Sequence, residues 1–350
     1  MASKTSAQAE AHSTNKASGK DKSGSKSQSA SHPSKSQELS SAPSKGASSK
    51  DVASIDAASK DVPSKDKPSK EAKPKTHHKP LILYAFAESE AGRTNLKFFV
   101  SQGLHDAADF IFILNGETDI DSTIPKKDNI KVVRRPNTCF DLGAYGEILR
   151  TNDLYKNYKR FIMMNASIRG PFLPHWAESC WSDLYLDRLT DKVKLVGMTA
   201  NCWPQFHVQS MIWATDDVGM ELLINPPAGS SEKDNFGSEE DSVGLAGCYD
   251  DWNHAVHAEV GTTKIFTKQG YKVDLMMTAY HKSKNYIEEC DTTQNGDVLW
   301  DGKYFGTNVH PFETIFIKAN RNIDPILIDH LTTWQQDSGY SSYDACRVSS

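Results

Sequence analysis

Aromatic side chains are missing from the first 79 residues of this 350-residue chain, and large aliphatic side chains are few there. Such a segment cannot bury enough apolar surface to offset the conformational entropy lost on ordering. The segment is instead rich in Ser, Lys and Ala, and it repeats the pattern of Ser49-Lys50-Asp51-Val52 in degenerate form. We therefore predict that residues 1–79 are a disordered tail.

A net positive charge is absent from the remainder of the chain. The formal net charge of the whole chain is −5 at pH 7. Residues 1–79 contribute 15 Lys against 8 acidic residues, or +7, so residues 80–350 carry about −12. An acidic body repels the phosphate backbone, so we expect no nucleic acid partner for the folded part.

Long apolar runs are also absent. The run at residues 81–87 is only as long as a strand, so no transmembrane segment is expected. The apolar stretch typical of a secretory signal does not follow Met1. We therefore expect a cytoplasmic protein, or one of the secretory pathway if the N-terminus is incomplete.

Neither a C-x-x-C pair nor a zinc-binding spacing occurs among the six cysteines. In a domain of this size, scattered cysteines favour free thiols over a disulfide framework, so we predict free thiols. The six residues are Cys139, Cys180, Cys202, Cys248, Cys290 and Cys346.

Strand-like apolar runs alternate with helical patterns from Pro80 onward. This order predicts an α/β, Rossmann-like fold, in which helices flank a mostly parallel sheet. We expect one folded domain over residues 80–335 and a C-terminal tail over residues 336–350. The expected strands cover residues 81–86, 109–114, 130–133 and 160–164, and the expected helices cover 94–104 and 141–151.

Ligands of open parallel sheets bind outside the carboxyl ends of the strands. In this chain those ends are polar or Gly-rich, at residues 86–89, 115–117, 134–137 and 165–169. Loops are polar for other reasons too, so this pattern alone does not distinguish a site from plain turns.

Five phrases together carry a family resemblance: NTCFDLGA (137–144), MNASIRGPF (164–172), HVQS (207–210), AEVG (258–261) and HPFETIFIK (310–318). Over roughly residues 80–335 the chain resembles fungal glycosyltransferase-like proteins that are distantly similar to the rhamnan-synthesis F family. The resemblance implies a GT-A-type domain that transfers a hexose or deoxyhexose from a nucleotide-sugar donor to a hydroxyl of a glycan or other acceptor, with inversion by analogy. The alternative is a catalytically inactive glycan- or nucleotide-binding protein that retains the fold.

The phrase at 164–172 leaves open whether donor binding needs a metal ion. GT-A transferases have an Asp-x-Asp motif at the end of this strand, which holds a metal ion and the donor pyrophosphate, whereas here the sequence is Asn165-Ala166-Ser167. Amide and hydroxyl oxygens are poor ligands for Mg²⁺ or Mn²⁺. Arg169 could neutralise the pyrophosphate, Asp141 could hold a metal or bond a sugar hydroxyl, or the site could be inactive. A helix cap at Asp141 and a turn at Asn165 are the plain alternatives.

Further donor-binding candidates follow the other strands. Glu88 and Asn95, together with Arg93, could contact the base or ribose of the nucleotide, although Asn95 could equally start a helix. Asn115 and Asn137 end the next two strands and complete the expected donor side.

Inverting transfer needs a carboxylate that accepts the proton of the acceptor hydroxyl. Glu259 has this position in the inverting GT-A pattern, Asp250 and Asp251 are rival bases, and an ordinary exposed helix glutamate is the alternative. The expected acceptor side comprises His207, Gln209, Ser210 and Trp300. For the histidine and the tryptophan, a structural role in the core is the alternative.

Overall fold

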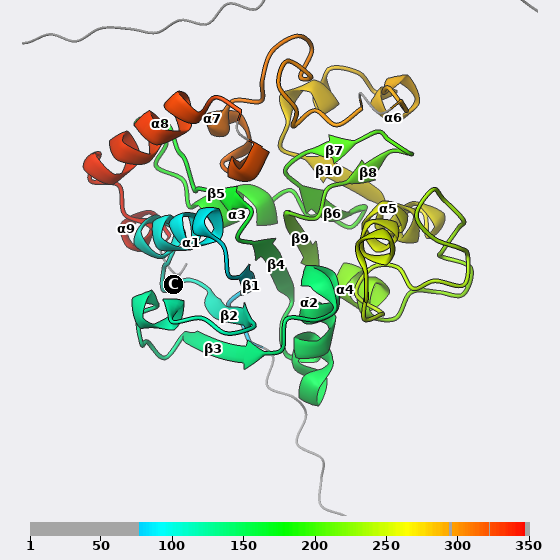
Figure 1. Ribbon diagram of the computed structural model, residues 1–350, viewed down its shortest axis with the longest axis horizontal. Coiled ribbons are helices and arrows are strands. Elements are labelled where there is room, and N and C mark those ends of the chain that lie inside the picture. Colours follow the sequence, from blue (N-terminus) through cyan, green and yellow to red (C-terminus); the bar gives the residue numbers. More distant parts are fainter. Residues whose placement is uncertain (1–76, 294–295, 322, 347–350) are drawn as a thin grey trace, which may run out of the picture. The chain divides into compact units, whose positions relative to one another are not determined.

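A seven-stranded sheet forms the centre of the computed structural model, which describes residues 77–346 apart from 294–295 and 322 (Figure 1). Its strands lie in the order β10-β6-β9-β4-β1-β2-β3. They are β1 Leu81–Ala87, β2 Asp109–Asn115, β3 Ile130–Arg135, β4 Arg160–Asn165, β6 Val193–Gly197, β9 Ile212–Asp216 and β10 Lys272–Leu275. Two short antiparallel pairs are formed by β5 Ile168–Arg169 with β11 Ile317–Lys318, and by β7 Ala200–Asn201 with β8 His207–Val208.

Neighbouring strands of the large sheet run parallel except at β9, which lies antiparallel between β4 and β6. The register pairs Leu81 with Asp109 and Ala87 with Asn115, so β1 and β2 end at the same edge. The central strands β1, β2 and β4 are buried almost throughout. Strands covered on both faces need continuous apolar sequence, which explains the runs seen there. The predicted α/β, Rossmann-like, mostly parallel sheet is confirmed.

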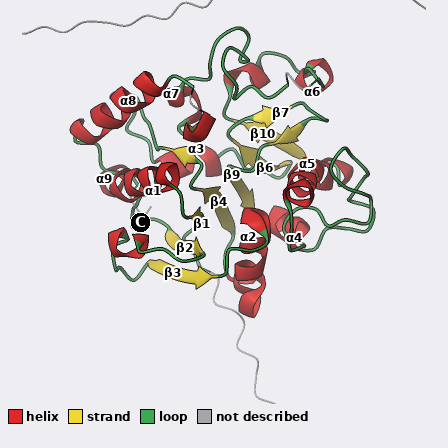
Figure 2. Cartoon of the chain, viewed as in Figure 1, coloured by secondary structure: helices red, strands yellow, loops and turns green. Residues whose placement is uncertain are grey.

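Helices cover both faces of the sheet (Figure 2). The chain passes from β1 to β2 and β3 on one side and returns to β4 on the other, so right-handed connections place α1 and α2 on opposite faces. Trp181 of α3 packs edge-on against Phe99 of α1, with 5.7 Å between ring centroids, whereas α4 and α5 pack with each other and α5 with α2. The helices are α1 Glu90–Gln102, α2 Phe140–Arg150, α3 Trp181–Leu186, α4 Asp217–Ile224, α5 Trp252–Lys268, α6 Tyr286–Glu289, α7 Pro311–Thr314, α8 Pro325–Asp337 and α9 Ser342–Ala345. Among the described helices, none combines the length and apolarity that crossing a membrane requires.

The pairing of β5 with β11 continues beyond the two strands. The backbone N–H of Ala319 donates to the carbonyl of Ser167 at 3.1 Å, and the N–H of Phe172 donates to the carbonyl of Ile315 at 2.7 Å. These bonds lay the segment 315–319 alongside the segment that follows β4. A late part of the chain therefore borders the carboxyl edge of the sheet.

The two predicted tails differ in what the structure describes. Residues 1–76 of the predicted N-terminal tail lie outside the described residues, as do residues 347–350. The described part of the predicted C-terminal tail packs on the folded body. Ser342 is buried and donates a hydrogen bond to the carbonyl of Gln102, and Cys346 is bonded to Cys180.

The prediction of free thiols is wrong, because all six cysteines form disulfides. The bonds join Cys139 to Cys248, Cys180 to Cys346 and Cys202 to Cys290, and the partners are 109, 166 and 88 residues apart. Separations of this length leave no local spacing pattern in the sequence. In the chain-entropy model, closing a 100-residue loop stabilises a fold by about 4.7 kcal/mol.

We therefore expect no thiol to react with iodoacetamide when the protein is denatured without reductant, and six to react after reduction. Non-reducing peptide mapping by mass spectrometry should recover the three pairs named above. Reduction should also lower the thermal unfolding midpoint, because the unfolded chain regains conformational entropy. Thiols that react before reduction would contradict the pairing.

Candidate functional site

The end of β4 is joined to the start of α2 by a hydrogen bond at the carboxyl edge of the sheet. The side chain of Asn165, which is 9% exposed, donates from Nδ2 to Oδ2 of Asp141 at 2.7 Å. Its Oδ1 accepts from the backbone N–H of Ser167 at 3.0 Å and from the Ser167 hydroxyl at 2.6 Å. These three predicted donor-side residues therefore form one connected group.

Lys318 of β11 is added to this group by strand pairing. It lies opposite Ile168 in the β5–β11 register, and Ile317 lies opposite Arg169. Because neighbouring residues of a strand point to opposite sides, Lys318 and Arg169 point away from each other. Burial lowers the pKa of Lys318, while the charges of Glu259 and Asp141 act to raise it. Within the described residues the Lys318 ammonium makes no hydrogen bond or ion pair, and the residue is half-buried.

Asp141 titrates closer to neutral pH than an ordinary aspartate. Burial raises its pKa to about 6, against the hydrogen bond from Asn165 and the charge of Lys318, and the charge of Glu259 adds to the rise. A shifted carboxyl among specific charged neighbours at the ligand-binding edge of a sheet is a signature of a functional site.

Glu259 reaches the same place from α5. It is half-buried, and its Oε1 accepts a hydrogen bond from the backbone N–H of Ser210 at 2.5 Å. Its charge influences both Asp141 and Lys318. Two carboxylates and one ammonium from three distant parts of the chain thus lie close enough for their charges to influence one another.

Arg169 points to the other side of the β5–β11 pair, toward α1 and α8. Its Nε donates to Oδ1 of Asn95 at 2.9 Å, and its guanidinium lies 3.3 Å from the Thr332 hydroxyl and 3.6 Å from Asp329. Asn95 is fully buried and also donates to the carbonyl of Ala166 at 2.8 Å. Both residues therefore fix the loop that carries the site.

The predicted acceptor residues have mixed surroundings. His207 is buried, and its Nδ1 lies 2.8 Å from the carbonyl of Gln205. Gln209 is also buried, accepts from the Thr199 hydroxyl at 2.7 Å and donates to Oδ1 of Asp297 at 3.2 Å. Both side chains are thus committed to internal contacts that shape the loop before β9.

An aromatic surface lies beside that loop. Trp300 is 48% exposed, and the guanidinium of Arg321 stacks on its ring at 4.1 Å from the ring centroid. Arg321 in turn forms an ion pair with Asp297 at 3.1 Å. Asp297, Arg321 and Lys318 were not predicted from the sequence as site residues. Of the three, only Lys318 belongs to one of the five phrases of the family resemblance, as the last residue of 310–318.

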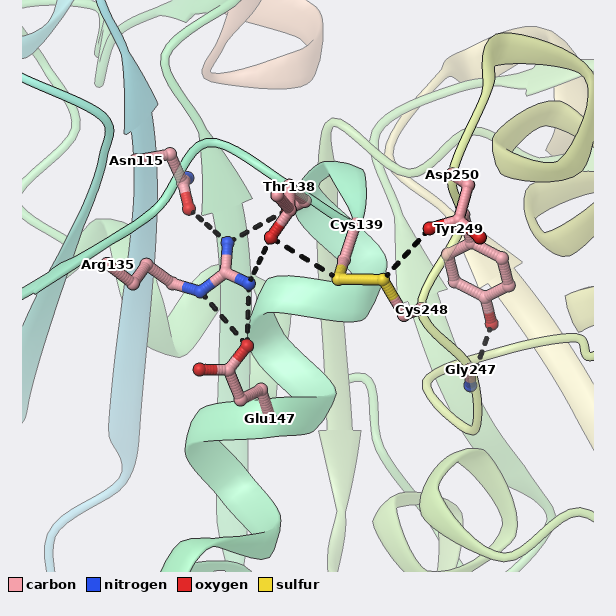
Figure 3. The surroundings of a disulfide bond; sticks show 9 residues. All are labelled: Asn115, Arg135, Thr138, Cys139, Glu147, Gly247, Cys248, Tyr249 and Asp250. Atoms are coloured by element: carbon pink, nitrogen blue, oxygen red, sulfur yellow. Dashed lines mark hydrogen bonds and ion pairs between the residues drawn. A yellow bond between two sulfur atoms is a disulfide. The ribbon is translucent and has the colours of Figure 1, made fainter.

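The rival bases lie at the beginning of α5. Asp251 caps the helix, since its Oδ1 accepts from the backbone N–H of His254 at 3.0 Å, and Asp250 is exposed beside Cys248 (Figure 3). An α-helix rises 1.5 Å per residue, so Asp251 lies about 12 Å from Glu259 along the axis. Within the described residues, no hydrogen bond or ion pair joins Asp250 or Asp251 to Asp141, Glu259 or Lys318.

The remaining donor candidates lie on the β1–β3 side of the edge. Glu88 accepts hydrogen bonds from Arg93 at 2.6 Å and from the Thr118 hydroxyl at 2.6 Å. Asn115 is buried and accepts from Arg135 at 2.7 Å (Figure 3). Asn137 is exposed. A ligand could contact the exposed Asn137 directly, whereas the side chain of the buried Asn115 is bonded to Arg135.

A disulfide fixes the segment that presents Asp141 (Figure 3). Cys139 and Phe140 have φ angles of 67° and 51°, in the left-handed region that non-glycine residues rarely adopt. The bond from Cys139 to Cys248 ties this strained turn to the loop before α5. Such strain persists only where the surroundings enforce it, and it concentrates at functional sites.

The residues at this edge do not fit a divalent metal. The Asn165 oxygen already accepts two hydrogen bonds, and Ser167 offers only a hydroxyl. The nearby carboxylates of Asp141 and Glu259 share their surroundings with the ammonium of Lys318, which a dication would repel. Hard cations need several free oxygen ligands, preferably carboxylates. Here Oδ2 of Asp141 and Oε1 of Glu259 already accept hydrogen bonds, which leaves few free carboxylate oxygens.

No family model and no curated protein matches the chain. Similar solved structures include the following two. A cytidylyltransferase from Leptospira borgpetersenii serovar Hardjo-bovis is 16% identical over 41% of this chain and 62% of its own, less than two thirds of its length, with a TM-score of 0.25. A mannosyltransferase from Pyrobaculum calidifontis in complex with GDP-Man and Mn²⁺ is 12% identical over 77% of this chain and 75% of its own, with a TM-score of 0.36. At these scores neither likeness assigns a function to this chain.

Replacement of Asp141 by Asn should stabilise the protein at neutral pH. The pKa of about 6 in the folded state exceeds the ordinary 3.8, so folding stability falls as pH rises from about 4 to about 6 and is then constant. Asp141→Asn removes this cost and should raise the free energy of unfolding at pH 7.5 by about 1–3 kcal/mol, with little effect at pH 4.

Thermal unfolding at both pH values measures this difference, and Asp128→Asn, at an exposed position, is the control that should change little. A variant that is less stable than wild type at pH 7.5 would show that Asp141 serves the fold as an ordinary ion-pair partner.

Proposed function

We propose that this protein is a glycosyltransferase that moves a sugar from a nucleotide-sugar donor to a hydroxyl of a glycan or other acceptor, on a GT-A-like domain. One observation carries the proposal: the charges of Lys318, Asp141 and Glu259 influence one another beside the carboxyl edge of a Rossmann-like sheet, where β11 pairs with the strand that follows β4. Displacement of a nucleoside diphosphate by a hydroxyl needs positive charge on the leaving group and a base for the proton. In this group Lys318 has the positive charge and Glu259 is the candidate base.

The proposed roles follow from the surroundings of each side chain. Lys318 would bind the diphosphate and stabilise the negative charge that it gains as its bond to the sugar C1 breaks. Glu259 would accept the proton of the acceptor hydroxyl as the new oxygen–C1 bond forms. Asp141, held by Asn165, would accept a hydrogen bond from a sugar hydroxyl. Attack from the face opposite the leaving group would invert the configuration at C1.

We further propose that the folded part matures in an oxidising compartment, in place of the expected cytoplasm. Three disulfides pair every cysteine of the chain, and protein disulfides are rare where glutathione and thioredoxin keep thiols reduced. The similarity to rhamnan-synthesis F proteins stays a prediction. It would suit a transferase that builds a polysaccharide.

Ligand-dependent stability tests the proposal. UDP, GDP, dTDP and their sugars are compared in a thermal-shift panel with EDTA and with Mn²⁺, and sugar transfer or donor hydrolysis is followed for each donor that binds. A ligand at 100 times its Kd stabilises the folded state by about 2.7 kcal/mol. We expect one nucleotide class to raise the midpoint equally with EDTA and with Mn²⁺.

Two variants separate binding from chemistry. Lys318→Ala should lose most of the ligand-induced shift, whereas Glu259→Gln should retain it and lose about 10²–10⁴-fold in kcat. Lys131→Ala, at an exposed position near the start of β3, is the matched control. A shift that needs Mn²⁺, or one that survives Lys318→Ala, would contradict the assigned role of Lys318. Donor binding without turnover would favour the non-catalytic alternative.

A further inference from the structure

A large groove lies on the face of the molecule that carries α3, α8 and α9, away from Lys318. Its volume is about 1480 Å³, which exceeds the range of about 300–1,000 Å³ typical of small-molecule pockets. Its walls come from the loop before α3, from α7 and from the helices α8 and α9, which are orange to red in Figure 1. Neither Lys318 nor Arg169 is among the residues that line it.

Exposed aromatic rings distinguish this groove from an ordinary surface hollow. Trp176 is 73% exposed, Trp334 is 59% exposed and Phe312 is 37% exposed, and all three line it. Single exposed apolar side chains are common, but several in one concavity mark a binding surface. We name it the aromatic groove, after these three rings.

The walls of the aromatic groove are fixed by buried contacts. Gln335 is 5% exposed, and its side-chain oxygen accepts from the backbone N–H of Leu173 at 3.1 Å, which joins α8 to the opposite wall. The disulfide between Cys180 and Cys346 joins the start of α3 to the end of α9. A cavity held in this way is formed before any ligand arrives, which reduces the entropic cost of binding.

The polar lining is acidic or neutral. No Lys or Arg lines the groove among the residues that the structure describes, whereas Glu178 and Asp183 do. Burial and the charge of the neighbouring Asp187 raise the pKa of Asp183. The same surroundings disfavour a further negative charge nearby. Phosphorylated or sulfated ligands are therefore disfavoured. Carboxylates and serine hydroxyls are instead suited to accept hydrogen bonds from hydroxyl groups.

The three rings of the groove do not stack on one another. None of the ring contacts found in the described residues joins two of Trp176, Phe312 and Trp334; Trp334 stacks on His330 instead. Each ring therefore has a face that a separate unit of an extended ligand can contact.

We propose that the aromatic groove binds a neutral oligosaccharide chain, with the apolar faces of successive sugar rings on Trp176, Phe312 and Trp334 and their hydroxyls on the carboxylates. It would serve as a second glycan site, which anchors a polymer away from the reacting group. This binding does not depend on the proposed transfer reaction, and either one can fail without the other.

Binding to the full-length protein tests the proposal, with mannohexaose, cellohexaose and maltohexaose as probes. Isothermal titration and tryptophan fluorescence should show that at least one of them binds, and more tightly than its disaccharide. The double variant Trp176→Ala with Trp334→Ala should bind at least tenfold more weakly at an unchanged unfolding midpoint, because both side chains are exposed. Trp334→Phe should restore part of the affinity that Trp334→Ala loses.

Trp252→Ala is the matched control, since this tryptophan is 61% exposed outside the groove. Its binding should equal that of wild type. The proposal is overturned if none of the three hexasaccharides binds, or if the double variant binds them as tightly as wild type does. Tighter binding of spermine, in competition with the sugar, would identify the groove as a cation site and overturn it equally.

Discussion

The antiparallel pairing of β5 with β11 is the contact on which the candidate site depends. β5 directly follows the loop after β4, and β11 comes from a part of the chain that is far away in sequence. Their register places Lys318 on the side of Asp141 and Glu259 and turns Arg169 toward α1 and α8. A shift of β11 by one residue would turn Lys318 away from this side, so the strand pairing decides whether the ammonium faces the two carboxylates.

The site is held in place at the expense of local stability. Asp141 is kept charged at neutral pH in surroundings that favour its protonated form, and the turn before it contains two residues with positive φ. Contacts elsewhere offset this cost: the disulfide from Cys139 to Cys248 and the hydrogen bond from Asn165. A fold without a function at this edge would gain stability by replacing the buried carboxyl.

The sequence predicts the parts of this architecture that depend on nearby residues. The strands could be found because a parallel sheet buried on both faces needs continuous apolar runs, and Asn165 and Ser167 could be found because they end such a strand. Lys318, the opposite direction of Arg169 and the three disulfides could not. Each depends on which distant segments meet, and that is set by packing of the whole domain. Burial of Gln209 and His207 likewise follows from tertiary contacts that a sequence pattern does not contain.

A crystal structure with a bound nucleotide sugar, grown with Mn²⁺ and measured at the manganese absorption edge, tests the role of Lys318 most directly. We expect the diphosphate to lie beside the Lys318 ammonium, with Glu259 facing the sugar C1 and no anomalous peak next to Asn165 or Asp141. A manganese peak bridging Asp141 and the diphosphate, with Lys318 turned away, would contradict this account of the site.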